Sequence, residues 1–190
     1  MFQAKTENQF LICVPVTFHG YRCIKNIGCG STSIVVLVEE MCTGKKYSAK
    51  IMSIEYIKKH NLANSIEKEI SVLKTIEHPH IIKMRENFEI KNEQNEKFIV
   101  IIMDYCEKGD LLTFSLNHQF KNEFHKKVII RGFLESIKYL HDKGISHGDI
   151  KADNILLCNH SAKLCDFGYC RTTSIAGEDS KNGTLYYAAP

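Results

Sequence analysis

The first half of the chain consists of short apolar runs separated by turn residues. A β-branched run at 34–38 follows a short run at 21–27, with glycines between them, and a similar run lies at 47–51. Short runs rich in β-branched and aromatic residues favour strands, and glycines favour the turns that join them. Up to residue 103 the pattern predicts three strands, one helix and two more strands.

Two segments have the spacing of amphipathic helices. The apolar stripe of the first comprises Ile66, Ile70, Leu73 and Ile76. Asn64, followed three residues later by Glu67, predicts an N-cap for this helix. The apolar stripe of the second comprises Phe124, Val128, Phe133, Leu134, Ile137 and Leu140. Gly144 supplies a glycine stop after it.

Composition and charge exclude several classes of protein. The 190 residues are 44% hydrophobic and 25% charged, which suffices for a globular core. The net charge of +3 is small and unclustered, so no nucleic-acid partner is expected. The apolar stretch at 10–16 is too short to span a bilayer and lacks the features of a signal peptide. We therefore expect a cytoplasmic chain without membrane insertion.

The cysteines and histidines show no metal or disulfide framework. Eight cysteines are scattered irregularly, without a C-x-x-C pair, which favours reduced thiols. Nine histidines show no zinc spacing, and His78 and His80 flank a proline in an expected helix-to-strand turn.

The strongest chemical signal lies between His147 and Gly168. The chain reads H-G-D-I-K-A-D-N, then an apolar run, then A-K-L-C-D-F-G. Asp149 can orient and deprotonate a hydroxyl group, and Lys151 can neutralise a moving phosphate. Asn154 and Asp166 can hold magnesium through oxygen atoms, which hard cations require. These groups together predict phosphoryl transfer from ATP.

A second set of residues lies in the first half. Gly28 and Gly30 stand between two expected strands, where a backbone without Cβ can approach phosphate oxygens. A glycine pattern of this kind is by itself more often a plain turn. Lys50 lies in the third strand, and a partly buried lysine there needs a charge partner. Glu69, beside the apolar stripe of the first helix, is the candidate, with Glu67 as a rival and a solvated surface glutamate as the alternative.

In this order and spacing, the motifs of residues 21–190 resemble those of the protein kinase family, serine/threonine type. The resemblance implies an α+β fold with two lobes, a small β-rich N-lobe and a helical C-lobe that is incomplete here. It divides the chain into an N-terminal extension (1–20), the N-lobe (21–103), a hinge (104–109) and a partial C-lobe (110–190) that runs through the activation segment.

The resemblance also implies ATP and Mg²⁺ as cofactors, together with a set of site residues. The implied catalytic residues are Asp149, Lys151, Lys50, Glu69 and Thr184, and the implied metal ligands are Asn154 and Asp166. The implied ATP-binding residues are Ile27, Gly28, Gly30, Val35, Ser48, Lys50, Met103, Asp104, Cys106, Asp110 and Leu156. The Asp104 carbonyl and the Cys106 amide would bind adenine. Asp110 has a second interpretation, as a helix cap.

Three departures from the family pattern matter. Ser33 replaces the third glycine of the loop, and Ser48 replaces an alanine that touches adenine. The Ser48 hydroxyl should weaken ATP binding only modestly if it finds a hydrogen-bond partner. Gly148 replaces the arginine that in many kinases clamps a phosphate of the activation segment. We therefore expect activity to depend little on phosphorylation of Ser180.

Two classes of function fit this sequence. The first is a protein kinase that transfers the γ-phosphate of ATP to Ser/Thr of protein substrates, a choice of acceptor indicated by Lys151 and Thr184. The alternative is a catalytically weak pseudokinase that acts as an ATP-binding or scaffolding module. A scaffold would be free to lose catalytic groups, and none is lost here, which favours the enzyme. A P-loop nucleotide-binding module would need G-x-x-x-x-G-K-[ST], which does not occur.

The last residues, 183–190, resemble the substrate-binding end of the activation segment, where the family continues with a glutamate. We therefore expect a fragment that lacks most C-lobe helices and is a poor catalyst by itself. The apolar side of the helix at 124–140 would then be exposed and prone to aggregation.

Overall fold

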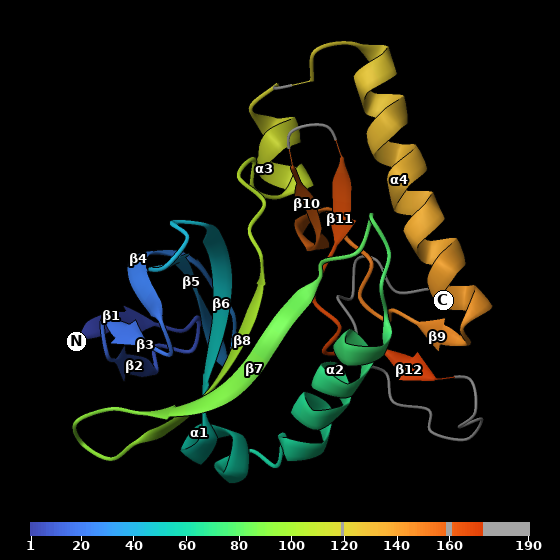
Figure 1. Ribbon diagram of the computed structural model, residues 1–190. Helices are drawn as coiled ribbons and strands as arrows, with labels where there is room; N and C mark the ends of the chain where they lie inside the picture. Colours follow the sequence, from blue (N-terminus) through green and yellow to red (C-terminus); the bar gives the residue numbers. More distant parts are fainter. Residues whose placement is uncertain (119, 159–160, 173–190) are drawn as a thin grey trace. The chain divides into compact units, whose positions relative to one another are not determined.

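The computed structural model describes residues 1–118, 120–158 and 161–172, which form two compact units (Figure 1). The first unit comprises Met1–Asn64 and Met84–Tyr105, and the second comprises Ser65–Lys83 and the chain from Cys106 onward. The first is rich in strands and the second contains the longest helices, as the expected α+β class requires. The boundaries at residues 20, 103 and 109 stay a prediction.

The first unit is built on a six-stranded sheet in the order β3-β4-β5-β6-β8-β7, with every pairing antiparallel. Its strands are β3 (Thr17–Phe18), β4 (Tyr21–Cys29), β5 (Ser33–Glu40), β6 (Lys46–Ser53), β7 (Met84–Lys91) and β8 (Lys97–Asp104). The helix α1 (Ile54–Lys59) follows β6, and the Ser53 side chain caps it by accepting a hydrogen bond from the Tyr56 amide. The three strands and the later pair that the sequence predicts are all present.

One face of this sheet forms the core of the first unit. Successive side chains of a strand point to opposite faces, so alternate residues share the core. The core residues of the three central strands are Ile34, Val36, Val38, Tyr47, Ala49, Ile51, Phe98, Val100 and Ile102. The intervening residues of β5, β6 and β8 consequently lie together on the opposite face.

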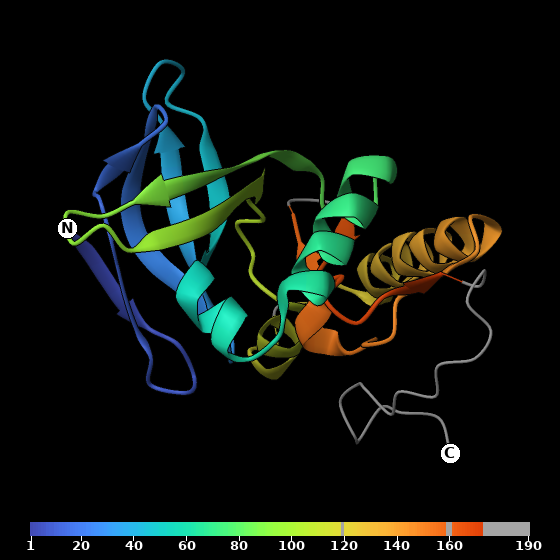
Figure 2. The same ribbon diagram turned by 90° about the horizontal axis from the view of Figure 1, so that it is seen from below.

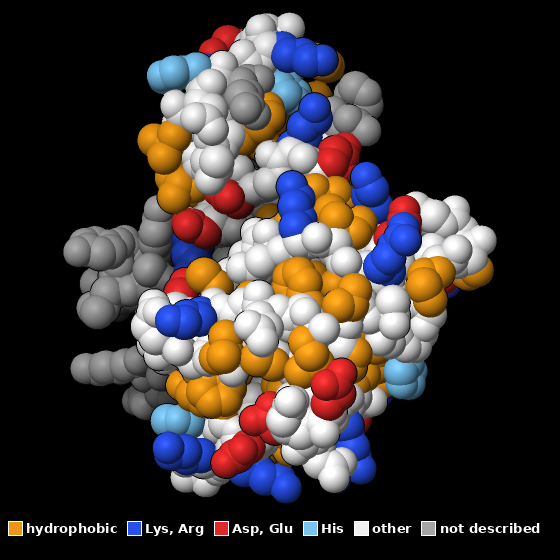
Figure 3. Space-filling view, turned by 90° about the vertical axis from the view of Figure 1, so that its left-hand side faces the viewer, with side chains coloured by type: hydrophobic (Ala, Val, Ile, Leu, Met, Phe, Trp, Pro, Cys, Tyr) orange, Lys and Arg blue, Asp and Glu red, His pale blue; other side chains and the backbone are white. Residues whose placement is uncertain are grey.

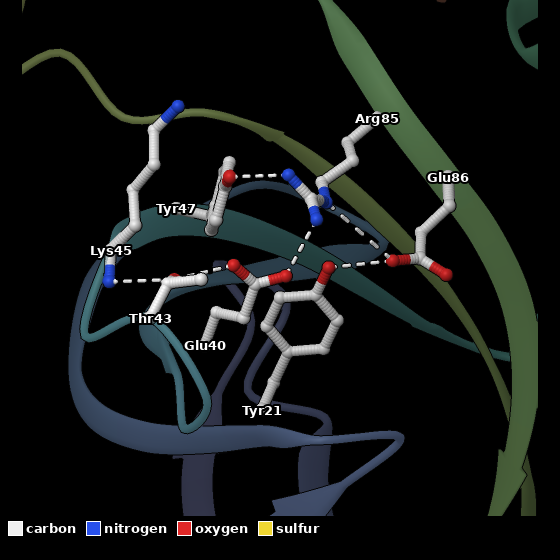
Figure 4. Close-up of polar contacts among 7 residues, drawn as sticks. All are labelled: Tyr21, Glu40, Thr43, Lys45, Tyr47, Arg85 and Glu86. Atoms are coloured by element: carbon white, nitrogen blue, oxygen red, sulfur yellow. Dashed lines mark hydrogen bonds and ion pairs between the residues drawn. The ribbon is translucent and has the colours of Figure 1, made fainter.

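A polar cluster joins strands that are not neighbours in the sheet (Figure 4). Arg85 on β7 donates to the Tyr47 hydroxyl at 2.5 Å and to Glu40 on β5 at 2.6 Å. Tyr21 on β4 donates to Glu86 at 2.5 Å. The edge strand β7 reaches β4 and β5 only because the sheet curls strongly around its core (Figure 2). Burial and the Glu86 carboxylate raise the pKa of Tyr21, which stays a donor.

Residues 1–20 contribute to this unit as well. The strands β1 (Phe2–Lys5) and β2 (Leu11–Val14) form an antiparallel hairpin, and Ile12 and Val14 are fully buried in the core. The turn of the hairpin contacts the glycine loop, because the Glu7 amide donates to the Gly30 carbonyl at 3.0 Å.

Some hydrophobic side chains of the first unit remain exposed. They include Met1, Leu11, Val16, Ile24 and Met41. Figure 3 shows the side of the molecule on which the chain begins, and hydrophobic side chains lie there among lysine, arginine and acidic residues. Scattered exposure of this kind is ordinary for a protein surface.

In its described residues, the second unit combines three α-helices with two small two-stranded antiparallel sheets. The helices are α2 (Ala63–Thr75), α3 (Leu111–Leu116) and α4 (Glu123–Asp142). The strands are β9 (Ile145–Ser146), β10 (Ile155–Leu157), β11 (Ala162–Leu164) and β12 (Arg171–Thr172), and β10 pairs with β11 while β9 pairs with β12. Helix α4 packs against β11 and β9 (Figure 1). Within the described ranges, no helix is long and apolar enough to cross a membrane.

Helix α2 confirms the predicted apolar stripe and corrects its start. Ile66 and Leu73 are buried, as the spacing predicts. The predicted N-cap at Asn64 is wrong, because the helix begins at Ala63 and Asn64 lies in its first turn. Glu69 is buried and its rival Glu67 is exposed, so the two glutamates lie on different faces of the helix.

Helix α4 buries only part of the predicted apolar stripe, namely Leu140. Its buried residues are Ile129, Gly132, Ser136 and Leu140. Phe124 and Leu134 of the predicted apolar stripe are exposed at 73% and 57%, which agrees with the expected exposure of the apolar side of this helix. His80 packs closely against the buried face, since a Cβ at Gly132 would lie 2.6 Å from its Nδ1 atom. Small residues therefore form the contact. The predicted glycine stop is present, because Gly144 has φ +67 just after the helix end.

Candidate active site

The glycine loop joins β4 to β5, as the sequence predicts. Gly28 pairs with Val35, and Cys29 pairs with Ile34, so the glycines lie at the end of the β-ladder. The Gly30 amide donates to the Ser33 carbonyl at 2.8 Å, which closes the turn. A Cβ at Gly30 would lie 3.3 Å from the Ser33 hydroxyl, so the loop has little room for a side chain there. Ile27 is partly exposed beside this loop.

Four of the predicted ATP-binding residues share one face of the sheet. Val35 pairs with Lys50 across β5 and β6, and Ser48 pairs with Met103 across β6 and β8. Each alternates along its strand with a residue of the core, so all four lie on the face opposite to the core. Lys50 is half-buried there. The glycine loop and the lysine thus belong to one rigid sheet.

The hydroxyl of Ser48 does find a partner. Its Oγ atom donates to the Asp104 carbonyl at 2.9 Å and lies 3.4 Å from the Met103 carbonyl. The Asp104 carbonyl is the group expected to bind adenine. A hydroxyl that donates to it occupies one of its two lone pairs.

The segment after β8 leads to a helix cap. Asp110 Oδ1 accepts from the Thr113 amide at 2.7 Å, and Oδ2 accepts from the Thr113 hydroxyl at 2.9 Å. Asp110 therefore caps α3, as its second interpretation predicts, and both of its oxygens take part. Its backbone forms a bridge with Leu156 on β10. The Cys106 sulfur lies 2.8 Å from the Cys158 sulfur.

The second unit holds Asp149 in a fixed orientation. Its side chain is buried, and the Asn154 amide donates to its Oδ2 at 2.9 Å and to its backbone carbonyl at 2.8 Å. Lys151 Nζ lies 2.9 Å from the same Oδ2. Burial alone would lower the pKa of Lys151, but its hydrogen bond to Asp149 and the charges of Asp149 and Asp166 outweigh burial and raise it. Lys151 therefore stays protonated beside Asp149 at neutral pH.

His147 supports this loop, a role that the sequence analysis did not assign. Its Nδ1 accepts from the Asp149 amide at 3.3 Å, so its Nε2 carries the proton and donates to the Cys165 carbonyl at 2.9 Å. Burial lowers the pKa of His147, which keeps the ring neutral. Its position two residues before Asp149 is the only signal that the sequence offers.

Asp166 lies beside the buried glutamate of α2. A Cβ built on Gly168 would lie 3.6 Å from Asp166 Oδ1 and 3.8 Å from Glu69 Oε2, so both carboxylates border this glycine. Ser65, one turn before Glu69, donates to the Gly168 carbonyl at 3.2 Å. Asp166 has φ +63, a left-handed conformation that non-glycine residues rarely adopt and that often marks a functional site.

The two expected magnesium ligands come from adjacent backbone segments. The Cys165 amide donates to the Asn154 carbonyl at 2.9 Å, which places Asp166 next to Asn154. The amide nitrogen of Asn154 binds Asp149, which defines the side-chain oxygen as the possible ligand. One amide and one carboxylate suit Mg²⁺, which keeps waters and binds substrate phosphates. Among the described residues, no three His, Cys, Asp or Glu side chains gather as a metal-binding group.

Gly148 has a structural role that the sequence did not reveal. Its φ of +81 is left-handed, and a Cβ there would lie 2.3 Å from the Tyr169 carbonyl oxygen. No side chain fits this position without movement of the backbone. The glycine thus lets the Asp149 loop pack directly on the segment after Asp166. Thr184 and Ser180 lie outside the described residues.

Comparison with known proteins identifies the family of the chain. Residues 21–190 match the protein kinase domain family. The chain is 32% identical to the serine/threonine-protein kinase cds1 of Schizosaccharomyces pombe over 177 residues, 90% of this chain and 37% of that protein. It is 36% identical to the probable serine/threonine-protein kinase fhkE of Dictyostelium discoideum over 174 residues, 86% of this chain and 24% of that protein. The chain spans well under half the length of these relatives. The matched domain covers almost all of the chain, and the chain therefore belongs to the protein kinase family, with its α+β fold.

Proposed function

We propose that the protein containing this chain is a protein kinase that transfers the γ-phosphate of ATP to serine or threonine hydroxyls. The observation that carries this proposal is the fixed Asp149 carboxylate, which Asn154 and Lys151 bind on the same oxygen. A buried carboxylate with a cation beside it can orient a hydroxyl and take its proton.

In this proposal the hydroxyl oxygen of the substrate attacks the γ-phosphorus while the bond from that phosphorus to the bridging oxygen of ADP breaks. The hydroxyl proton passes to Asp149. Lys151 stabilises the negative charge on the transferring group, because its pKa is raised and it stays protonated. His147 remains neutral and keeps the loop in place through its two hydrogen bonds.

The remaining groups would bind the nucleotide. The backbone amides of the glycine loop and Lys50 would hold phosphates, and Glu69 stays the predicted charge partner of Lys50. Adenine would contact the Asp104 carbonyl and the Cys106 amide. The apolar lining would come from Ile27, Val35, Met103 and Leu156. Asn154 and Asp166 would hold Mg²⁺, which neutralises phosphate charge.

The acceptor class and the location belong to the proposal too. Lys151 stands two residues after Asp149, as in serine/threonine kinases, and both relatives bear that description in their names. None of the eight cysteines, all within the described ranges, forms a disulfide, which supports a reducing, cytoplasmic location.

The test is phosphate transfer by the full-length protein from radiolabelled ATP to a serine-containing protein. Asp149→Asn and Asp166→Asn should lower the rate by at least about a hundredfold, because the first removes the proton acceptor and the second removes a carboxylate that would hold Mg²⁺. Asp142→Asn, an exposed residue of α4, is the matched control and should keep the wild-type rate. Unfolding midpoints should show that all three variants fold.

Activity that survives within a few fold in both site variants would contradict the assignment. A wild-type protein that binds MgATP but transfers no phosphate would favour the pseudokinase.

A further inference from the structure

Two thiols meet at the end of the segment that follows β8. The sulfur atoms of Cys106 and Cys158 lie 2.8 Å apart, although the residues are distant in the sequence. A disulfide bond is about 2.05 Å long, so closure requires a movement of less than about 1 Å. Cys42, in contrast, is an exposed cysteine in the turn between β5 and β6.

Backbone hydrogen bonds hold the two thiols in place. The Lys108 amide donates to the Leu157 carbonyl at 3.1 Å, and the Leu157 amide donates to the Gly109 carbonyl at 2.8 Å. Leu157 directly precedes Cys158, and Lys108 and Gly109 follow shortly after Cys106. The Cys158 amide in turn donates to the Ser161 carbonyl at 2.9 Å. The proximity of the sulfurs therefore follows from paired backbone rather than from flexible side chains alone.

The two thiols have different surroundings. Cys106 is buried and Cys158 is partly exposed. The hydrogen bond to Cys158 and burial raise the pKa of Cys106, which therefore keeps its proton. Cys158 is the thiol that solvent and small oxidants can reach, and as a thiolate it would be the nucleophile of the pair.

We propose that Cys106 and Cys158 form a dithiol modification site, at which a hydroperoxide oxidises the pair to an intramolecular disulfide. The Cys158 thiolate attacks the terminal peroxide oxygen, the O–O bond breaks, and the alcohol or water leaves with the proton that the thiol released. The Cys106 sulfur then attacks the sulfenic acid of Cys158, the S–O bond breaks, and water leaves with the Cys106 proton. Two thiols and one hydroperoxide give one disulfide, one alcohol or water, and one water.

The disulfide would tie the segment at Cys106 to strand β10. On the proposed function, the Cys106 amide binds adenine and Leu156 of β10 lines the same pocket. Displacement of that amide by up to about 1 Å would take it out of hydrogen-bond range of adenine. Nucleotide binding would then respond to peroxide, and a thiol reductant would reverse the effect.

The first test needs neither nucleotide nor activity. The 190-residue chain is treated with hydrogen peroxide, its remaining thiols are alkylated, and its peptides are mapped by mass. We expect a Cys106–Cys158 linked peptide, lighter by two hydrogens than the reduced pair, that dithiothreitol separates. The oxidised chain should also unfold at a temperature roughly 5 °C or more higher, because the bond closes a long loop.

Matched variants separate this site from general oxidation. Cys158→Ser should lose the linked peptide and the rise in unfolding temperature, whereas Cys42→Ser should keep both. Alkylation of both Cys106 and Cys158 after peroxide has oxidised Cys42 would overturn the proposal. Linked peptides that join either residue to other cysteines, or that join two chains, would overturn it as well.

The second test concerns the nucleotide and is separate. MgATP should bind the disulfide form at least about threefold more weakly than the reduced form, which corresponds to a hydrogen bond lost or lengthened. Equal affinity would overturn the redox control of nucleotide binding. Absence of nucleotide binding in both forms would count against the proposed function, while the mass measurement would still decide the disulfide.

Discussion

At the scale of the single residue, Gly148 shows how one position can be occupied by glycine alone. Any other residue there would destabilise the folded state in two ways, through its left-handed backbone and through the contact of its Cβ with the Tyr169 carbonyl. Each is an energetic cost of folding. Gly44 is the matched control, since its φ of +70 carries the first cost and no atom lies within 4 Å of a Cβ built on it.

We expect Gly44→Ala to lower the free energy of unfolding by about 1 kcal/mol, and Gly148→Ala to lower it by about 2 kcal/mol or more. Urea denaturation followed by fluorescence measures both. Equal losses in the two variants would show that the contact with Tyr169 relaxes at no cost. Gly148→Arg, which introduces the residue common in the family, should destabilise the chain at least as much as the alanine does.

Ser48 is a second residue with a measurable effect. Its hydroxyl donates to the Asp104 carbonyl, with which adenine would compete. We expect Ser48→Ala to strengthen MgATP binding about fivefold, the equivalent of one ordinary hydrogen bond. Titration calorimetry on the 190-residue chain gives the dissociation constant. Ser53→Ala, at the other end of β6, removes the cap of α1 and should lower stability without changing this constant. Unchanged or weaker binding by Ser48→Ala would mean that the serine does not compete for the carbonyl.

At the scale of the element, the polar cluster of Figure 4 stabilises the curl of the sheet. Arg85 bonds Glu40, whose side chain is only 11% exposed. Removal of Arg85 would therefore leave a nearly buried carboxylate without that partner. Arg22 and Glu39 form a more exposed pair on β4 and β5. Exposed ion pairs contribute little, and partly buried ones more.

We expect Arg85→Ala to lower the free energy of unfolding more than Arg22→Ala, whose effect should stay below about 0.5 kcal/mol. Chemical denaturation at two salt concentrations measures both, and only the Arg22 effect should fade strongly with salt. Equal losses of stability in the two variants would contradict a role for Arg85 in holding β7 against β5.

At the scale of the whole molecule, stability should depend on pH through buried histidine. Burial lowers the pKa of His147 below the ordinary value of about 6.5 that it regains on unfolding. As the pH falls below about 6.5, the unfolded chain takes up a proton that the folded chain does not, so the folded state loses stability. Burial and the neighbouring His80 lower the pKa of His78 and add to the same trend.

Denaturation between pH 7.5 and about 5.5 should therefore show a falling free energy of unfolding. His147→Gln keeps a donor for the Cys165 carbonyl and should flatten this slope, whatever its effect on stability at pH 7.5. His118→Gln, at an exposed position, is the matched control and should leave the slope unchanged. A slope that His147→Gln does not alter would show that other groups cause the pH dependence.

Much of the fold could be predicted because it depends on local pattern. The strands around the glycine loop and the stripe of α2 follow from apolar spacing, which neighbouring residues determine. The predicted cap at Asn64 differed from the structure, whereas the predicted exposure of the apolar side of α4 is present at Phe124 and Leu134. The residues that α4 does bury depend on what packs against the helix, as the contact of Gly132 with His80 shows. Glu69 was preferred over its rival Glu67, and burial separates the two glutamates.

The sequence by itself determined the family, the order of the five strands between residues 21 and 103 and of the two amphipathic helices, and the identity of the candidate chemical groups, because motifs and periodicities are local properties. Only the tertiary structure decided which groups bind one another. Asn154 and Lys151 meet on one oxygen of Asp149, Ser48 bonds the Asp104 carbonyl, and two distant cysteines become neighbours. Hydrogen bonds depend on distances of a few tenths of an ångström between segments far apart in the chain, and no local pattern encodes those distances.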